Sequence, residues 1–391
     1  MEDNFLSRID IKKFVFKLLE LCLYALPITY VIGDHISNPL LLIWIPIIYL
    51  LFHLLDKSLP FDAILRERGL FLLCLLWVTS IFSIGLPSAW HHSRDFLSGL
   101  LVLSATIEVI CRDRKALNIF VVVLSLLGVY LGIDSIYQWF FKIDLFGVKL
   151  CGCRAMANLW HPNFLGFVLS ASLPSSLYLM YKLKSRYHIY LVFIAALLAF
   201  CGIVLSGSRS AWIATLVILF ITTPLLLREQ NRIFQLVFLG LGGICAVLLA
   251  GRVIIRRISS TIHHQNPRIA LWKKSLHIIG QFPALGTGID NWKIHSIWAK
   301  VTFPHNFFLE IATECGVPLL LLFCYCIYRI VRVYFIPLWR HVEGRFYLCI
   351  TIGPFIAAII DIPFFSRHVS TFFWTCLGIT IGAFRNLYED R

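Results

Sequence analysis

The length of the apolar blocks constrains this chain more than any other feature of its sequence. Hydrophobic residues fall in blocks of about 17–25, the length that a helix needs to cross the hydrocarbon core of a bilayer. They make up 59% of the 391 residues, against 14% charged residues, which leaves too little polar sequence to cover a soluble core. We therefore predict an all-α, polytopic membrane protein in which residues 1–391 form a single membrane domain. The roughly twelve spans that we predict from these blocks are 14–33, 39–55, 70–86, 96–111, 118–141, 163–181, 189–206, 211–227, 233–251, 306–328, 346–362 and 370–384.

Lys and Arg are divided unevenly between the two sets of connecting segments. The set that includes both termini holds most of them, and the short loops of the other set hold few. Since cytoplasmic loops carry an excess of Lys and Arg, we predict that both termini are cytoplasmic. A long loop over 252–305, between the ninth and tenth spans, then faces outward, which in a Gram-negative cell is the periplasm. The net charge of +14 is mostly an orientation signal; it predicts contact with anionic membrane lipids and not with nucleic acid, because the basic residues are scattered.

Short outer loops avoid arginine, so an arginine in one of them needs a reason. Arg209 lies in Ser206-Gly207-Ser208-Arg209-Ser210, a brief break between two spans whose glycine and serines permit a tight turn. The side chain is either an interfacial anchor that reaches from the membrane to water or part of an anion site.

The long loop places a second arginine at the start of an amphipathic segment. Asn266 suits the N-cap of a helix and Pro267 its first position, so we expect Arg268 in the first turn. Free backbone N–H groups and the helix dipole favour an anion there. A helix that merely lies on the membrane surface is the simpler alternative.

A histidine and several polar residues mark two further outer segments. The long loop ends in Pro304-His305-Asn306, and Glu310 follows on the first turns of the next predicted span. His305 titrates near neutral pH beside a proline that fixes the turn, although a lone interfacial histidine is more often an anchor. The loop over 142–162 adds Arg154 and His161.

Together these segments resemble the bacterial O-antigen ligase and O-antigen polymerase superfamily. The resemblance covers about residues 200–380, and the N-terminal half is similar only in hydropathy. Asp361 followed by Arg367 is a further element of this kind, and because an intramembrane aspartate is costly we expect the two side chains to pair. The motifs that carry the resemblance are Gly207-Ser208-Arg209-Ser210, Pro267-Arg268 before a Trp-bearing helix, Gly286-Thr287-Gly288, and Pro304-His305-Asn306 with Leu309-Glu310 and Gly316. The segment Trp160-His161-Pro162-Asn163 is also similar to the family.

The resemblance implies a GT-C-like glycosyltransferase that moves a glycan from undecaprenyl diphosphate to a sugar hydroxyl on the periplasmic face. Arginines can neutralise the departing diphosphate, and the outer loops contain no DxD pair, so we expect neither a metal nor another cofactor. We assign Arg209 and Arg268 to the diphosphate and His305 to the acceptor proton. The residues expected to bind substrate are Arg154, His161, Asn306, Glu310, Asp361 and Arg367.

Four functions remain in competition. We expect an O-antigen ligase, whose acceptor is lipid A-core, because family polymerases often have two long periplasmic loops, whereas this chain has one long loop and a shorter one over 142–162. An O-antigen polymerase, which extends the glycan on its lipid carrier, is the nearest alternative. A protein O-oligosaccharyltransferase is third, because those chains tend to be longer. A twelve-span transporter would need two similar halves, which the sequence lacks.

Overall fold

The protein forms a bundle of helices. The computed structural model describes residues 2–32, 34–59, 86–183, 185–229, 242, 251, 255, 267–292, 303–361 and 366–388. Within these ranges the fold is helical and contains no extended strand, only isolated bridges in the loop that follows α7. The elements are α1 Glu2–Ile32, α2 Asp34–Pro39, the π-helical turn η1 Leu40–Trp44, α3 Ile45–Asp56, α6 Leu86–Arg112, α7 Arg114–Phe141, α8 Pro162–Lys182, α9 Arg186–Ser206, α10 Arg209–Glu229, α12 Pro267–Gln281, α14 Phe307–Cys315, α15 Val317–Ile330, the π-helical turn η2 Val331–Phe335, α16 Ile336–Trp339, α17 Val342–Asp361 and α18 Arg367–Tyr388.

Eight helical segments in the described part of the chain are long and apolar enough to cross a membrane. This confirms an all-α polytopic membrane protein, while the count of twelve stays a prediction because the spans expected over 70–86 and 233–251 lie almost wholly outside the described residues. The helices expected over 96–111 and 370–384 are present as α6 and α18, but neither is among the eight. The eight segments are Ile11–Ile32, Ile36–Asp56, Arg114–Phe141, Pro162–Lys182, Tyr187–Ser206, Arg209–Leu227, Val317–Trp339 and Val342–Ile359.

The tenth span differs from its prediction. We expected one helix over 306–328, but the structure breaks it at Gly316 into the short α14 and the longer α15. Gly316 adopts φ 87° and ψ 165°, a conformation almost restricted to glycine, so the helix cannot continue through it. The membrane-length segment is therefore Val317–Trp339, and α14 belongs to the region that precedes it.

Helix α8 is the centre of the bundle. It packs against α7, α9, α10 and α17, and nearly all its residues are buried. Close approach depends on glycine: a Cβ atom on Gly353 of α17 would lie 2.4 Å from the carbonyl oxygen of Ser170. Small residues at such contacts let membrane helices gain van der Waals contact along their length.

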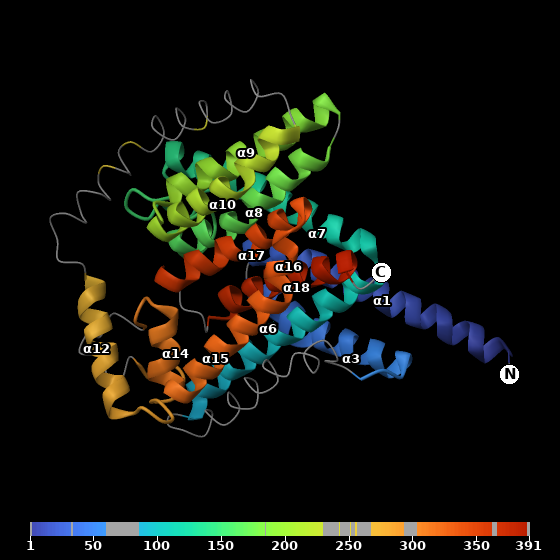
Figure 1. Ribbon diagram of the computed structural model, residues 1–391, viewed down its shortest axis with the longest axis horizontal. Coiled ribbons are helices and arrows are strands. Elements are labelled where there is room, and N and C mark those ends of the chain that lie inside the picture. The colour runs from blue at the N-terminus through green and yellow to red at the C-terminus, as the bar shows by residue number, and fades with distance from the viewer. Residues whose placement is uncertain are drawn as a thin grey trace.

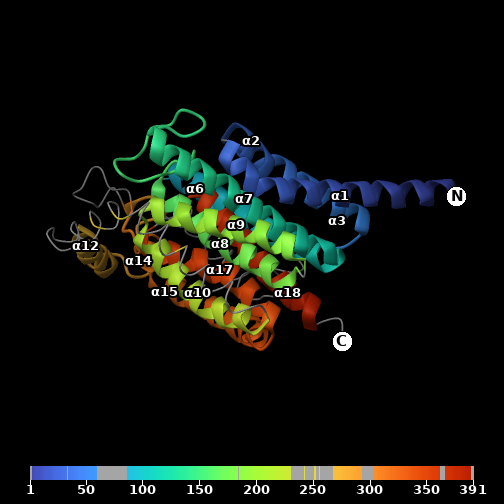
Figure 2. The ribbon, with the colours of Figure 1, turned by 90° about the horizontal axis from the view of Figure 1, so that it is seen from above.

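The bundle has two different ends. Both termini lie at one end, and the loop over 142–161, α12 and α14 lie at the other, hereafter the far end (Figure 1). Seen from above, the same segments again lie opposite the termini (Figure 2). The chain thus collects the segments that carry the predicted site at one end.

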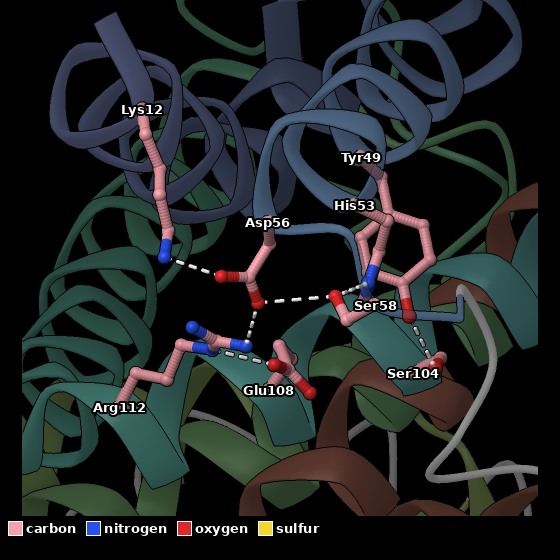
Figure 3. A network of polar contacts seen from close by, with 8 residues as sticks. All are labelled: Lys12, Tyr49, His53, Asp56, Ser58, Ser104, Glu108 and Arg112. Atoms are coloured by element: carbon pink, nitrogen blue, oxygen red, sulfur yellow. Dashed lines mark hydrogen bonds and ion pairs between the residues drawn. The ribbon is translucent and has the colours of Figure 1, made fainter. Parts of the chain in front are cut away.

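An ion-pair network joins α1, α3 and α6 (Figure 3). The Asp56 carboxylate, at the C-terminus of α3, accepts from Lys12 and from Arg112, whose Nη2 atom lies 2.6 Å from Oδ2. The hydroxyl of Ser58 donates to the same carboxylate oxygen at 3.0 Å, and Arg112 also pairs with Glu108. Because several charges share one carboxylate, removal of Asp56 would leave the two cations without a common partner.

Candidate functional site

The predicted arginine break is a tight turn between α9 and α10. Gly207 ends α9 in the left-handed conformation, with φ 58°, and its N–H donates to the Val204 carbonyl at 3.0 Å. The N–H of Ser208 donates to the Ser206 hydroxyl at 3.2 Å. Arg209 is then the first residue of α10, partly buried, and flanked by buried serines. Because a helix N-terminus carries a partial positive charge, it reinforces the guanidinium as an anion site.

Hydrogen bonds from Arg154 hold the loop over 142–161 against this break. Its Nε donates to the Ser206 carbonyl at 2.7 Å, and its Nη2 donates to the Asn163 side-chain oxygen at the start of α8. The N–H of Ala155 donates to the Leu205 carbonyl at 3.0 Å. These contacts give Arg154 a positioning role beside Arg209; its predicted contact with substrate stays a prediction.

His161 is the N-cap of α8. Its extended backbone precedes Pro162, and its Nδ1 accepts from the N–H of Asn163 at 3.1 Å. This leaves the exposed ring at the surface of the far end. The cap explains a histidine before Pro-Asn without reference to substrate, so the predicted binding role is again untested.

Buried polar residues that the sequence analysis missed shape the same loop. Asp134 and Gln138, on the last turns of α7, and Asp144 in the loop are at most 2% exposed. Asp134 accepts from the N–H of Leu145 at 2.9 Å, and the Gln138 side-chain oxygen accepts from two loop N–H groups at 2.8 and 3.0 Å. The Asp144 carboxylate accepts three more. An aspartate inside an apolar span was the available signal, because such residues are expensive in a membrane and seldom lack a role.

Arg268 is the second residue of α12, as predicted, and is partly buried. The predicted N-cap, Asn266, lies outside the described residues. One face of α12 is held by an indole, since Nε1 of the buried Trp292 donates to the Ser275 hydroxyl at 3.0 Å and its ring packs with Leu271 and Ile278. The helix also packs against α14. Contacts with protein therefore account for part of its amphipathic pattern, which the surface-helix alternative assigned to lipid.

Two glycines dock the segment after α12 onto the junction of α14 and α15. Gly286 and Gly316 have φ of 69° and 87°. A Cβ atom on Gly316 would lie 2.3 Å from the Ala284 carbonyl oxygen, and one on Gly286 would lie 2.4 Å from the carbonyl carbon of Glu314. Three backbone hydrogen bonds cross this contact: Thr287 N–H to Thr313 at 2.8 Å, Gly288 N–H to Glu314 at 2.9 Å, and Val317 N–H to Pro283 at 2.8 Å. The contact sets α12, and with it Arg268, against α14.

His305 lies immediately before α14 in a strained backbone conformation. Its φ is 51°, in the left-handed region that costs a non-glycine residue about 1–2 kcal/mol. Its ring lies 4.1 Å, centroid to centroid, from that of Phe303. Asn306 is the N-cap of α14 and accepts from the N–H of Leu309 at 3.1 Å, and Glu310 is buried in the first turn. This backbone conformation sets the direction in which the His305 side chain points from the chain.

Arg367 begins α18 and pairs with α6. Its Nε donates to Asp95 at 2.9 Å, and Nη1 donates to the side-chain oxygen of Asn38. The side chain of Asp361, which we expected to be its partner, lies outside what the structure describes, so that pairing stays a prediction. Next to Arg367, the ring of His368 lies 4.3 Å from that of Trp160. This cluster joins α2, α6 and α18 to the loop that Arg154 holds.

Part of the chain matches a known protein family. Residues 194–324 match a family model described as O-Antigen ligase. The matched range contains Arg209, Arg268 and His305, and it excludes Arg154 and Arg367. No curated protein matches the chain.

Proposed function

We propose that this chain, which matches an O-Antigen ligase family model over residues 194–324, belongs to the O-antigen ligase and polymerase superfamily. Within it, the chain is an O-antigen ligase that transfers undecaprenyl-diphosphate-linked polysaccharide to a sugar hydroxyl of lipid A-core. One observation supports it above the others. Arg209 and Arg268 lie at the N-termini of α10 and α12, and His305 lies just before the N-terminus of α14. These helices begin at the far end of the bundle (Figure 1). Helix N-termini and guanidinium groups both favour anions, which suits a diphosphate donor.

The reaction is a displacement at the anomeric carbon of the donor sugar. The acceptor oxygen attacks this carbon, the bond to the diphosphate oxygen breaks, and the electron pair leaves with undecaprenyl diphosphate. His305 takes the proton of the acceptor hydroxyl or orients that hydroxyl for attack. In-line attack inverts the anomeric centre.

Arg209 and Arg268 stabilise the charge that grows on the leaving group. A guanidinium binds phosphate oxygens through two parallel hydrogen bonds and keeps its charge at any working pH. Donors of this kind, held in place before the reaction, commonly contribute about 3 kcal/mol each to transition-state stabilisation. The glycine contact at Gly286 and Gly316 supports such preorganisation, because it fixes the helix that carries Arg268. On this proposal the far end faces the periplasm, both termini are cytoplasmic, and the membrane is the bacterial inner membrane.

Deletion of the gene and electrophoresis of lipopolysaccharide test the proposal. For a ligase we expect the whole ladder to disappear while polymer accumulates on the lipid carrier. A core capped by a single repeat would instead identify an O-antigen polymerase, which is the second candidate because the family includes both. An unchanged ladder would refute both.

Complementation with variants at position 305 tests the role of the histidine. Asn tolerates the left-handed backbone but is no base at neutral pH, so His305→Asn removes the proton acceptor without adding strain. We expect its turnover to fall by about 10²–10⁴-fold, the usual contribution of acid–base catalysis. Unchanged turnover in this variant would refute the assignment of the base.

A further inference from the structure

Two cysteines lie close together on the loop at the far end of the bundle. Cys151 and Cys153 belong to the loop over 142–161, whereas the other cysteines that the structure describes lie within helices. Cys151 is exposed, Cys153 is half-buried, and both are free thiols. A cysteine buried inside a helix behaves as a small apolar side chain, but a thiol that water reaches can react. The pair therefore offers two neighbouring thiols to a reagent dissolved in water.

The two cysteines belong to a tight turn. The N–H of Cys151 donates to the Arg154 carbonyl at 3.1 Å, and the N–H of Arg154 donates to the Cys151 carbonyl at 3.0 Å. Gly152, between the cysteines, has φ 64°, and a Cβ atom on it would meet nothing within 4 Å. Because glycine adopts more backbone conformations than other residues and has open space here, the turn can rearrange at this position.

A disulfide between Cys151 and Cys153 is within reach of such a rearrangement. Cα atoms two residues apart are separated by at most about 7 Å, which is close to the upper limit for a disulfide. The two thiols differ in exposure in the present turn, so a bond between them requires the backbone to move. A disulfide that closes so short a loop gains little from chain entropy and is strained. Strained, exposed disulfides are labile and take part in exchange.

Closely spaced cysteines also bind metal ions. A structural zinc site takes four ligands. Within the described ranges, no group of three or more His, Cys, Asp or Glu side chains could hold an ion. The surroundings of the pair therefore favour redox chemistry.

Arg154 couples the turn to the candidate site. It follows Cys153 directly, and its side chain donates to the Ser206 carbonyl at 2.7 Å and to the side-chain oxygen of Asn163. Movement of Cys153 therefore displaces the residue that holds the loop against the break that carries Arg209. The reduced turn keeps these contacts, and the rearrangement that a disulfide requires breaks them.

We propose that Cys151 and Cys153 form a thiol–disulfide switch that controls how Arg154 holds the loop over 142–161. The inference rests on the proposed function, which places this end of the bundle in the periplasm, where disulfides form. The oxidant is an external disulfide. The exposed Cys151 thiolate attacks one of its sulfurs and expels a thiolate, and the Cys153 thiolate then attacks the Cys151 sulfur and expels the second. Two electrons pass to the external disulfide, and the expelled thiolates take up the two protons that the cysteines lose.

Mass spectrometry reports the state of the pair. Trypsin cleaves after Lys149 and Arg154 and releases residues 150–154, which contain both cysteines and no others. The full chain in phospholipid nanodiscs is equilibrated with mixtures of oxidised and reduced glutathione, and its free thiols are alkylated as it is unfolded for digestion. We expect this peptide to change from two alkyl groups to an internal disulfide across the mixtures. Two alkyl groups in every mixture, or glutathione on Cys151 without an internal bond, would overturn the proposal.

Proteolysis and glycan transfer measure the coupling to Arg154. In the oxidised native chain we expect tryptic cleavage after Lys149 to be about tenfold faster, as the loss of one or two hydrogen bonds predicts, and transfer to fall by a similar factor. Cys151→Ser should behave as the reduced wild type in every mixture. Cys324→Ser, the control, replaces an exposed cysteine of α15 and should keep the wild-type response. Equal rates in the oxidised and reduced wild type would refute the switch.

The same samples keep the two proposals separate. Transfer by the reduced chain, with no disulfide formed in any mixture, overturns the switch alone. A disulfide that speeds cleavage of the loop in a chain that transfers no glycan supports the switch and overturns the proposed function.

Discussion

Gly316 and Gly286 form a contact whose energy can be worked out from the structure. In a Gly316→Ala variant the new methyl group meets the Ala284 carbonyl oxygen at 2.3 Å, which neither backbone can accommodate without moving. The residue also keeps a φ and ψ that cost a non-glycine residue about 1–3 kcal/mol. If the two segments separate instead, three backbone hydrogen bonds are lost at about 1 kcal/mol each. Either response predicts a local destabilisation of about 3 kcal/mol.

Hydrogen exchange measures this local change directly. We expect the N–H groups of Thr287, Gly288 and Val317 to exchange roughly a hundredfold faster in Gly316→Ala, which corresponds to about 3 kcal/mol. Glycan transfer should fall as well, because the contact positions α12. Gly280, which is exposed in α12 with open space around it, is the matched control. Gly280→Ala should leave these amides unchanged and stabilise its helix by about 0.5–1 kcal/mol.

The double variant makes the reasoning refutable. Because Gly286→Ala breaks the same contact, adding it to Gly316→Ala should cost little more than either change alone. Two fully additive effects, or wild-type exchange in Gly316→Ala, would show that the contact does not hold the two segments together.

Three further predictions concern the loop, the helix caps and pH. Arg154→Lys keeps the charge but cannot replace both guanidinium contacts, one of which is to Asn163. We expect faster proteolysis of the loop over 142–161 and a loss of about 1–2 kcal/mol of local stability. Proteolysis at the wild-type rate would contradict this. Asn306→Ala removes the cap of α14 and should lower the stability measured by thermal unfolding by about 1 kcal/mol. Asn306→Asp should keep the cap but slow glycan transfer, because its carboxylate repels the diphosphate. Full activity in Asn306→Asp would argue against an anion at this end. Asp113, which caps α7, has its pKa held below the ordinary 3.8 chiefly by the N–H of Lys115. Because the folded pKa is the lower one, the carboxylate contributes stability above pH 3.8 that is lost as pH falls through the folded value; in acid titrations followed by thermal unfolding, Asp113→Asn should lack this loss.

Sequence reasoning located the features that depend on neighbours along the chain. The block lengths placed most spans, and Pro267 placed the start of a helix outside them. These signals are local, because a cap or a bilayer-length block is complete within a few turns. The turn at Gly207 was recognisable for the same reason.

The features that depend on distant segments could not be predicted in this way. Hydropathy is continuous through Gly316, so it could not show that the 283–288 segment approaches there and ends the helix. Arg367 pairs with Asp95, 272 positions away, and no spacing rule reaches that far.

The central position of α8 has a consequence for biogenesis. Its partner α17 is synthesised about 180 residues later, so a ribosome delivers α8 to the membrane long before this neighbour exists. The serine hydroxyls of α8 do not need α17 as a partner during that interval, because those at 170, 172, 175 and 176 each donate to a carbonyl of their own helix at 2.6 to 3.3 Å. A helix whose side-chain donors are bonded internally is exposed to lipid at little cost in free energy. Its small side chains still form a smooth surface against which α17 packs later.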